Sequence, residues 1–548
     1  MKKAKKILAL LLVCVLAVAL AACGGSDGGD SSSPGSSAAP GTSSSAGGSE
    51  SPGSSSSPGG SAGSSSSGRD TLTIAVTADS GTLNPIRLSG DFGAITRCYM
   101  ENLWDVNEYN EKTWVLATSV DEVADDHWIV HLREGVTFSN GSPFKANDVL
   151  FSIKMTAEGG FSSAPRVQNV NVEETSVIDD YTVDLVLLSY HISGWTILSD
   201  LLIFDEDTYD EEDFAIHPIG TGPYVVDEYV VNSYVALSSR DDYWGAAPAI
   251  PHMEFRVLSE PSQIVNALTV GAIDIGPVST DDYEYVQGLS NYTIESRPGT
   301  WAAIYFNMVV GNTFNSLDAR NAVSHALDRQ VITDLVYNGH ATVMNSIVSS
   351  AAWDYEPRFD NASETYSIGY DVALAQELAD RSGLTGQTIR VITNGTAPHV
   401  MIAEIMQNQL REIGVTVQIN NYDVASFMSV VQDPSRTMYE IWVGSVAQVN
   451  RIVADPMVNG VRYSEVYRED GVWDDIWRFL EVGPDCFYNP DPKAHSDNTY
   501  ETLKLYQDGN LSYAFCDYLT FTAFSTDLAG PFVWRCTGRM NYKDFAFK

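Results

Sequence analysis

Basic residues are scarce in this sequence of 548 residues: 32 Lys and Arg stand against 71 Asp and Glu, so the formal net charge is -39. Surfaces that bind phosphate groups need clustered Lys and Arg, so this charge argues against a nucleic-acid partner and against electrostatic docking on anionic lipid. Apolar residues make up 44% of the chain, and the length suits two or three lobes. The composition predicts a large globular protein with ample material for its cores.

Catalytic signatures are also missing. His127 and His131 have the spacing of two metal ligands on a helix, but their segment alternates like a strand, so packed or solvated His is the better interpretation. The two G-x-S-x-G matches lie in a Gly/Ser-rich stretch, with no strand before them and no helix after them. Segment 220–222 lacks the third glycine of a dinucleotide loop. We therefore predict no catalytic residue, no metal site and no cofactor.

The N-terminus has the organisation of an export signal. Four Lys residues precede an apolar run, Ile7–Leu20, which is short for a membrane-spanning helix. Leu20-Ala21-Ala22-Cys23 then resembles the lipobox of bacterial lipoproteins, in which the Cys becomes the first mature residue and carries the lipid. We predict a signal peptide over 1–22 and a protein anchored through Cys23 to the extracytoplasmic face of the cell membrane.

A tether follows the anchor. Of the 46 residues from Gly24 to Arg69, 33 are Gly or Ser. Such a segment lacks the apolar side chains that would offset the entropy cost of ordering, so 23–69 is predicted to be lipidated at its first residue and otherwise disordered. The Cys residues at 98, 486, 516 and 536 remain beyond it. Their spacing does not choose between disulfide pairings and free buried thiols.

The body from 70 onward alternates between strand and helix patterns. Segments 71–76 and 127–132 are predicted strands, and Asn147 is predicted to cap a helix. Ser316 is predicted to cap a helix over 317–338, with Val323, Ala326, Leu327 and Leu335 buried. In 371–420 a helix capped by Asp371, a strand, a helix with Pro398 in its first turn and a second strand follow in order. This order predicts an α/β fold with parallel strands.

Seven segments of the body together form a recognisable pattern. They are Trp128–Phe144, Asn147–Ile153, His217–Tyr224, Asp242–Gly245, Leu268–Ile275, Tyr305–Asn307 and Leu317–Arg329. In this order they resemble the family 5 extracellular solute-binding proteins, which are the oligopeptide, dipeptide and nickel receptors of ABC importers. The resemblance covers nearly all of 70–548.

The resemblance implies a two-lobed fold of the periplasmic-binding-protein type (type II), with an extra inserted subdomain and a ligand cleft between the lobes. Lobe one would comprise 70–115, 216–305 and 480–548, the inserted subdomain 116–215, and lobe two 306–479. Hinges would lie near 306–307 and 478–484. The implied function is capture of a solute, most often an oligopeptide, by a monomer that delivers it to the permease subunits of an ABC importer. A surface sensor of signalling peptides and a secreted peptidase are the alternatives.

The family's pattern also marks candidate ligand contacts. Peptide receptors carry a Gly-Trp and then an Asp that pairs with the peptide amino terminus, but this chain has Ser445 and Gln448 at those positions, and Asp455 is the next acid. The helix that begins near Pro398 lacks the Arg that binds a dipeptide carboxylate. A buried charged terminus without a partner is costly, so we expect a longer peptide or a non-peptide solute, and little effect of acetylating a peptide's amino terminus. The predicted ligand contacts are Ser80, Gly81, Thr82, Leu83, Trp301, Trp442, Ser445 and Gln448; core packing is the alternative for the two Trp residues.

Overall fold

The computed structural model describes residues 69–87, 93–107, 110–159, 166–308, 312–363, 369–433, 435–447, 482–483, 485–530 and 540–548. The chain divides into two units, Met1–Ser64 and Ser65–Lys548, and the description below concerns the second. The predicted signal peptide, Cys23, most of the tether, Gln448, Asp455 and Cys536 lie outside the described residues. Within the described ranges, no helix has the length and apolar character needed to cross a membrane.

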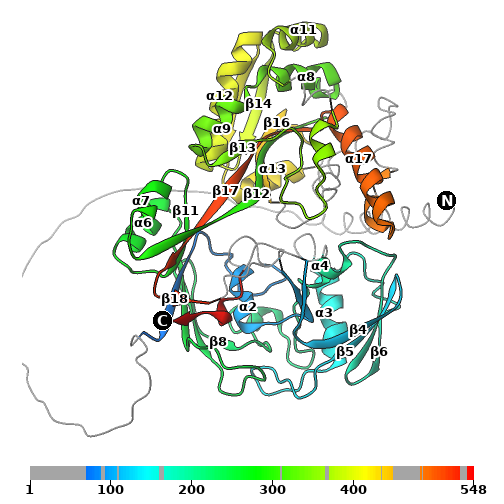
Figure 1. Ribbon diagram of the computed structural model, residues 1–548, viewed down its shortest axis with the longest axis vertical. Helices are drawn as coiled ribbons and strands as arrows, with labels where there is room; N and C mark the ends of the chain where they lie inside the picture. Colours follow the sequence, from blue (N-terminus) through cyan, green and yellow to red (C-terminus); the bar gives the residue numbers. More distant parts are fainter. Residues whose placement is uncertain are drawn as a thin grey trace, which may run out of the picture. The chain divides into compact units, whose positions relative to one another are not determined.

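One sheet of eleven strands runs through the body, in the order β15-β14-β16-β12-β17-β11-β1-β10-β9-β8, with β13 also paired to β17 (Figure 1). The strands are β1 (Thr71–Val76), β8 (Tyr224–Val230), β9 (Tyr234–Ser239), β10 (His252–Val257), β11 (Ile275–Val278), β12 (Tyr292–Phe306), β13 (Ala341–Val343), β14 (Thr388–Thr393), β15 (Thr416–Asn421), β16 (Ile441–Ala447) and β17 (Ser512–Ser525). The pairs β14–β15, β14–β16, β1–β10 and β1–β11 are parallel, and the remaining pairs are antiparallel. The predicted α/β class is confirmed.

Two separate cores give the body its two lobes. In lobe one, β1, β8, β9 and β10 pack with α2 (Thr96–Tyr99) and the C-terminal strands β18 (Leu528–Ala529) and β19 (Ala546–Phe547). In lobe two, α8 (Leu317–Ala326), α9 (Arg329–Tyr337), α11 (Val372–Ser382), α12 (Ala397–Leu410) and α17 (Pro492–Asp508) pack on β12, β14, β16 and β17. The two longest strands, β12 and β17, contribute to the cores at both ends and so connect the lobes (Figure 1).

A second sheet is formed by the part of the chain between β1 and β8, and it has a core of its own. Its order is β4-β5-β7-β6, with β4 (Ala117–Ala124), β5 (His127–Leu132), β6 (Ser176–Asp179) and β7 (Thr182–Val186), and it packs with α3 (Ala146–Glu158). Every second residue of β5 is buried, as the predicted strand requires. Gly135 and Gly141 adopt left-handed backbone angles, with φ of 76° and 87°, in the reversals after this strand. The glycines of the family signature therefore shape turns.

The remaining elements are short or lie at the edges of these cores. They are β2 (Trp104–Val106), β3 (Lys112–Trp114), α4 (Gly194–Leu198), α5 (Glu211–Phe214), α6 (Pro261–Thr269), α7 (Tyr283–Gln287), α13 (Val424–Gln432) and α16 (Asp485–Tyr488), with 3-10 helices at Thr313–Asn315, Pro357–Asn361, Arg411–Ile413 and Tyr542–Asp544.

Two helix predictions need correction. Ser316 caps α8, as predicted, but this helix ends at Ala326 because Leu327 is extended and the Asp328 side chain accepts from the backbone N–H groups of the next helix, α9. The expected helix over 317–338 is therefore two helices, and Leu335 is 58% exposed, not buried. Asn147 is not a cap either. Lys145 holds that position in α3, and its backbone N–H donates to Asp148 Oδ2 at 2.8 Å.

The segment 371–420 forms as predicted. Asp371 caps α11, which ends at the left-handed Gly383, and Pro398 lies in the first turn of α12. The cysteine question is partly resolved: Cys98, Cys486 and Cys516 are free and buried. Burial raises their thiol pKa values to about 12, 11 and 12, so these thiols are packing groups.

Candidate ligand-binding site

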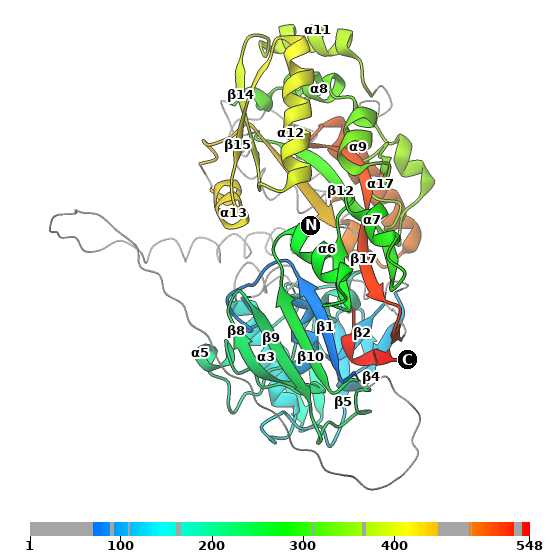
Figure 2. The same cartoon turned by 90° about the vertical axis from the view of Figure 1, so that its left-hand side faces the viewer.

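The carboxyl edge of the parallel strands in lobe two carries a chain of neutral polar groups. His399 lies in the first turn of α12, which follows β14 and packs along β14 and β15 (Figure 2). Its Nδ1 lies 2.7 Å from Asn394 Oδ1, and its Nε2 lies 2.8 Å from Ser445 Oγ on β16. Ser445 is in turn hydrogen-bonded to Tyr518 on β17. Ligands of α/β folds bind at this edge of the sheet, so the position suits a binding site.

Burial decides the charge of this chain of groups. It lowers the pKa of His399 to about 4, so the imidazole is neutral at physiological pH. Burial also raises the pKa of Tyr518, so its phenol stays protonated. In this chain the first turn of α12 therefore carries His399, an uncharged ring with both nitrogens hydrogen-bonded, where dipeptide receptors carry an Arg. This ring cannot supply the missing counter-charge for a peptide carboxylate.

Trp442 lies half-buried on the opposite face of the same strand. Its ring stacks on Tyr305 of β12, with centroids 3.9 Å apart and planes 9° apart, and it meets Phe427 of α13 edge to face at 5.9 Å. A Cβ on Gly444 would lie 2.3 Å from Cζ3 of the indole, so the ring lies directly over this glycine. The sequence Trp-x-Gly therefore builds a flat aromatic surface on β16.

Trp301 is a core residue. It lies in β12 and is only 2% exposed, and it belongs to the main core of lobe two. In the structure the Trp301 side chain therefore packs in the core, which was the alternative to ligand contact.

The loop after β1 contains both a core residue and residues that solvent reaches. Leu83 is fully buried in the lobe-one core, and its carbonyl accepts from Tyr99 Oη at 2.6 Å. Gly81 is exposed with φ of 71°, and Ser80 and Thr82 are partly buried. Contact of a solute with this loop stays a prediction for 80–82, whereas the Leu83 side chain packs inside the lobe.

Strand alternation separates two of the predicted contacts. Trp301 pairs with Val446 on one side and with Asp517 on the other, while Ala302 pairs with Ser445. Directly opposite residues share a face and neighbours along a strand do not, so Ser445 points to the α12 side and Trp442 to the other. The structure does not bring Ser445 and Trp442 together on one surface.

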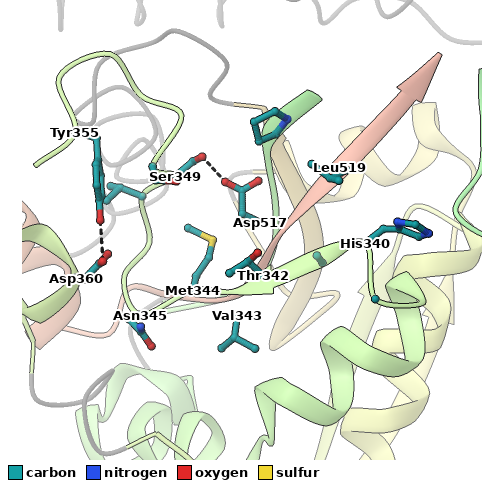
Figure 3. Close-up of a pocket in the computed structure, with 15 residues that line it drawn as sticks. His340, Thr342, Val343, Met344, Asn345, Ser349, Tyr355, Asp360, Asp517 and Leu519 are labelled. Atoms are coloured by element: carbon teal, nitrogen blue, oxygen red, sulfur yellow. Dashed lines mark hydrogen bonds between the residues drawn. The ribbon is translucent and has the colours of Figure 1, made fainter. Parts of the chain in front are cut away.

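The face that carries Asp517 has a cavity that the sequence did not reveal (Figure 3). Its volume is about 350 Å³, and it lies between the middle of β12 at Pro298, β13, β17 and the segment that follows β13. It is lined by Pro298, Gly339, His340, Ala341, Thr342, Val343, Met344, Asn345, Val348, Ser349, Ser350, Tyr355, Asp360, Asp517 and Leu519.

Three hydrogen-bond donors hold the Asp517 carboxylate in this cavity. The carboxylate accepts from the Ser349 hydroxyl (Figure 3), from the Gly299 backbone N–H at 2.9 Å and from the Thr300 backbone N–H. Burial raises its pKa, and the three donors act against that rise. One sequence signal was overlooked: Asp517 is the only charged residue among the fourteen of β17, and a lone acid in an apolar strand needs a reason.

Long strands join the two lobes, and polar and aromatic groups lie at the sheet edge and on its faces. This arrangement is that of a two-lobed binding protein. The sequence profile described as "Bacterial extracellular solute-binding proteins, family 5 Middle" matches residues 113–456. The chain belongs to this family. It is accordingly a solute-binding protein rather than an enzyme, and it acts outside the cytoplasm.

Known relatives agree with this assignment. The chain is 23% identical over 469 residues to the oligopeptide-binding protein AppA of Bacillus subtilis, which covers 79% of this chain and 80% of the relative. The structure of AppA in complex with a nonapeptide superposes with a TM-score of 0.74 at 18% identity, over 87% of this chain and 99% of that one. NikZ of Campylobacter jejuni in complex with Ni(L-His) gives the same TM-score, identity and coverage. These structures confirm the predicted two-lobed fold.

Proposed function

We propose that this protein captures oligopeptides outside the cell and delivers them to the permease subunits of an ABC importer. The observation that carries the proposal is the similarity to an oligopeptide-binding protein along both lobes, over 79% of the chain. A receptor of this kind closes its lobes around the ligand and needs no reacting groups of its own.

The ligand would be longer than a dipeptide. At the carboxyl edge of lobe two, His399 is neutral and Ser445 is already hydrogen-bonded, so neither supplies a charge for a peptide end. Burying a charged terminus there without a partner would cost several kcal/mol. A peptide held along its backbone, with side chains against the Trp442 surface, avoids this cost.

The division into lobes would differ from the predicted one in two places. The inserted subdomain would begin near 103 instead of 116, because Leu103, Trp104 and Val106 belong to the core of the four-stranded sheet. Lobe two would comprise 306–518, because α17 and the first part of β17 belong to its core, and lobe one would comprise 70–102, 216–305 and 519–548. The protein would act as a monomer.

Attachment to the membrane would be through Cys23 alone, as a lipoprotein whose Gly/Ser tether holds the body away from the bilayer. The motivation is the lipobox-like Leu20–Cys23 after a compact apolar run. Labelled palmitate should enter the wild type and not Cys23→Ala. Equal labelling of the two would contradict the anchor.

Native mass spectrometry tests the capture function. The protein purified from its own host should carry peptides, and peptides added as a pool should be retained at their intact masses. Shortened products would favour the peptidase. A bound nickel complex or another non-peptide solute in place of any peptide would refute peptide capture. A sensor and an importer's receptor both retain peptide, so loss of peptide uptake in cells that lack this chain separates them.

A further inference from the structure

We propose that the cavity lined by Asp517 receives a cationic group of the bound peptide, an ammonium or a guanidinium, with the Asp517 carboxylate as its counter-charge. This inference rests on the proposed capture of peptides. It identifies the part of the peptide that lobe two selects and the residue that selects it.

The geometry of Asp517 leaves room for one more donor. An ionised carboxylate offers about four acceptor positions. Three are occupied, by the Ser349 hydroxyl and by the backbone N–H groups of Gly299 and Thr300. These donors come from the strand beside β17 and from the segment after β13, so they fix the carboxylate against the cavity wall. A group held in this way pays little entropy when it binds a cation.

The cavity lining contains acids but no permanently charged base among the described residues. Its fifteen lining residues, all within the described part of the chain, include Asp360 and Asp517 but no Lys or Arg. Asp360 Oδ2 accepts from Tyr355 Oη at 2.7 Å (Figure 3), and burial together with this bond raises the pKa of Tyr355 to about 12, so the phenol stays neutral. The ring of His340 packs against Tyr283 in a tilted arrangement, with centroids 4.5 Å and planes 55° apart. A cleft with charge of one sign and apolar walls concentrates the opposite charge.

The walls and the size fit the end of an aliphatic chain. Val343, Met344, Val348 and Leu519 line the cavity alongside the polar groups, which suits a methylene stem that ends in a charge. A volume of about 350 Å³ is near the lower limit of small-molecule pockets. The cavity therefore holds one residue or a chain end, while the remainder of the peptide lies elsewhere.

Two parts of a peptide carry this chemistry: the amino terminus, and a Lys or Arg side chain. If the amino terminus enters, acetylation weakens binding and the expectation drawn from Gln448 is wrong. If a side chain enters, acetylation has little effect and replacing Lys by norleucine weakens binding.

The test uses Asp517→Asn, which keeps the shape of the side chain and removes its charge. Asp334→Asn is the matched control, because Asp334 is an exposed acid of lobe two bonded to Gln330 Nε2 at 2.8 Å. Each protein is incubated with a library of random hexapeptides, and the retained peptides are sequenced by mass spectrometry. Hexapeptides retained by the wild type are then resynthesised with the terminus acetylated, with Lys and Arg replaced by norleucine, and with both changes, and are titrated calorimetrically.

We expect the doubly neutral peptides to bind the wild type and the control at least ten-fold more weakly than their parents. Asp517→Asn should bind parent and neutral peptides within about three-fold of each other. Asp360→Asn, at the second acid of the cavity, should give a smaller loss of selectivity. Asp517→Ser is the uncharged variant to use if Asp517→Asn fails to fold by circular dichroism.

The inference fails if neutral and charged peptides bind the wild type equally, or if Asp517→Asn keeps the preference. If Asp517→Asn does not fold, an unchanged preference in Asp517→Ser overturns it. These failures leave peptide capture intact. Capture itself fails in a different way, when neither the library nor the host supplies any retained peptide.

Discussion

Adding one methyl group at Gly444 should dislodge the aromatic surface on β16. A Cβ at this position would lie 2.3 Å from Cζ3 and 2.9 Å from Cε3 of Trp442, whereas carbon atoms in contact prefer about 3.5–4.0 Å. Relief requires the indole to move by more than about 1 Å. The movement would disturb the stack on Tyr305 at 3.9 Å and the edge contact with Phe427 at 5.9 Å.

The expected cost follows from these contacts. Overpacking costs about 1–3 kcal/mol, and an aromatic pair contributes about 0.5–1.5 kcal/mol beyond its buried area. Gly444→Ala should therefore lower the free energy of unfolding by about 2–4 kcal/mol. Urea titration measures this as a lower midpoint at an unchanged slope, provided that the lobes unfold in one transition. The near-ultraviolet circular dichroism of the indole should change as well.

A double-mutant cycle tests whether the indole is the cause. In a Trp442→Ala background the obstructing ring is absent, so Gly444→Ala should cost less than about 1 kcal/mol. Gly276→Ala in β11 is the control substitution, because the nearest atom to its Cβ, Cδ1 of Ile273, lies at 3.0 Å rather than 2.3 Å. An equal cost of Gly444→Ala in both backgrounds would refute the reasoning and place the clash in the backbone.

Three further predictions concern other groups. Burial lowers the pKa values of His191 and His399 to about 4, so the unfolded chain binds more protons between about pH 6.5 and 4. Stability should fall as pH drops through this window, and His399→Gln should make the fall shallower; an unchanged slope would show that His399 is not buried neutral. In a Cys536→Ala variant, the thiols of Cys98, Cys486 and Cys516 should react with a disulfide reagent only after unfolding, and fast labelling of the native protein would contradict their burial. Retained peptides should change the intrinsic fluorescence of the wild type, and Trp442→Phe should lose most of that change; an unaltered change and affinity would show that Trp442 is only a packing residue.

Local signals predicted the elements that are determined locally. Asp371, Gly383 and Pro398 act within one turn of the chain, so their effect on α11 and α12 could be predicted from neighbouring residues. The break between α8 and α9 was missed because neither Leu327 nor Asp328 is a strong helix breaker. Asp328 ends one helix by capping the next, and only the packing of both helices on one core makes that arrangement favourable.

The part of the site at the edge of the parallel strands could be predicted from the sequence. The part formed by segments far apart in the chain could not. The order of strands and helices in 371–420 predicted the parallel strands whose edge carries His399, and the family's pattern marked Ser445. The hydrogen bond between these two side chains was not predicted. The Asp517 cavity is formed by β13, β17 and the segment after β13, which has no periodic pattern. No local rule connects residues 349 and 517.

The two polar sites differ in what they can offer a ligand. The chain through Asn394, His399 and Ser445 is neutral, and its members bond one another, so a ligand must break those bonds to gain new ones. Asp517 keeps an acceptor position and a charge, and it points to the other face of the sheet, the face that also carries the Trp442 surface. Charge selection by lobe two therefore belongs on the Asp517 face, while the edge at His399 fixes the shape of the site.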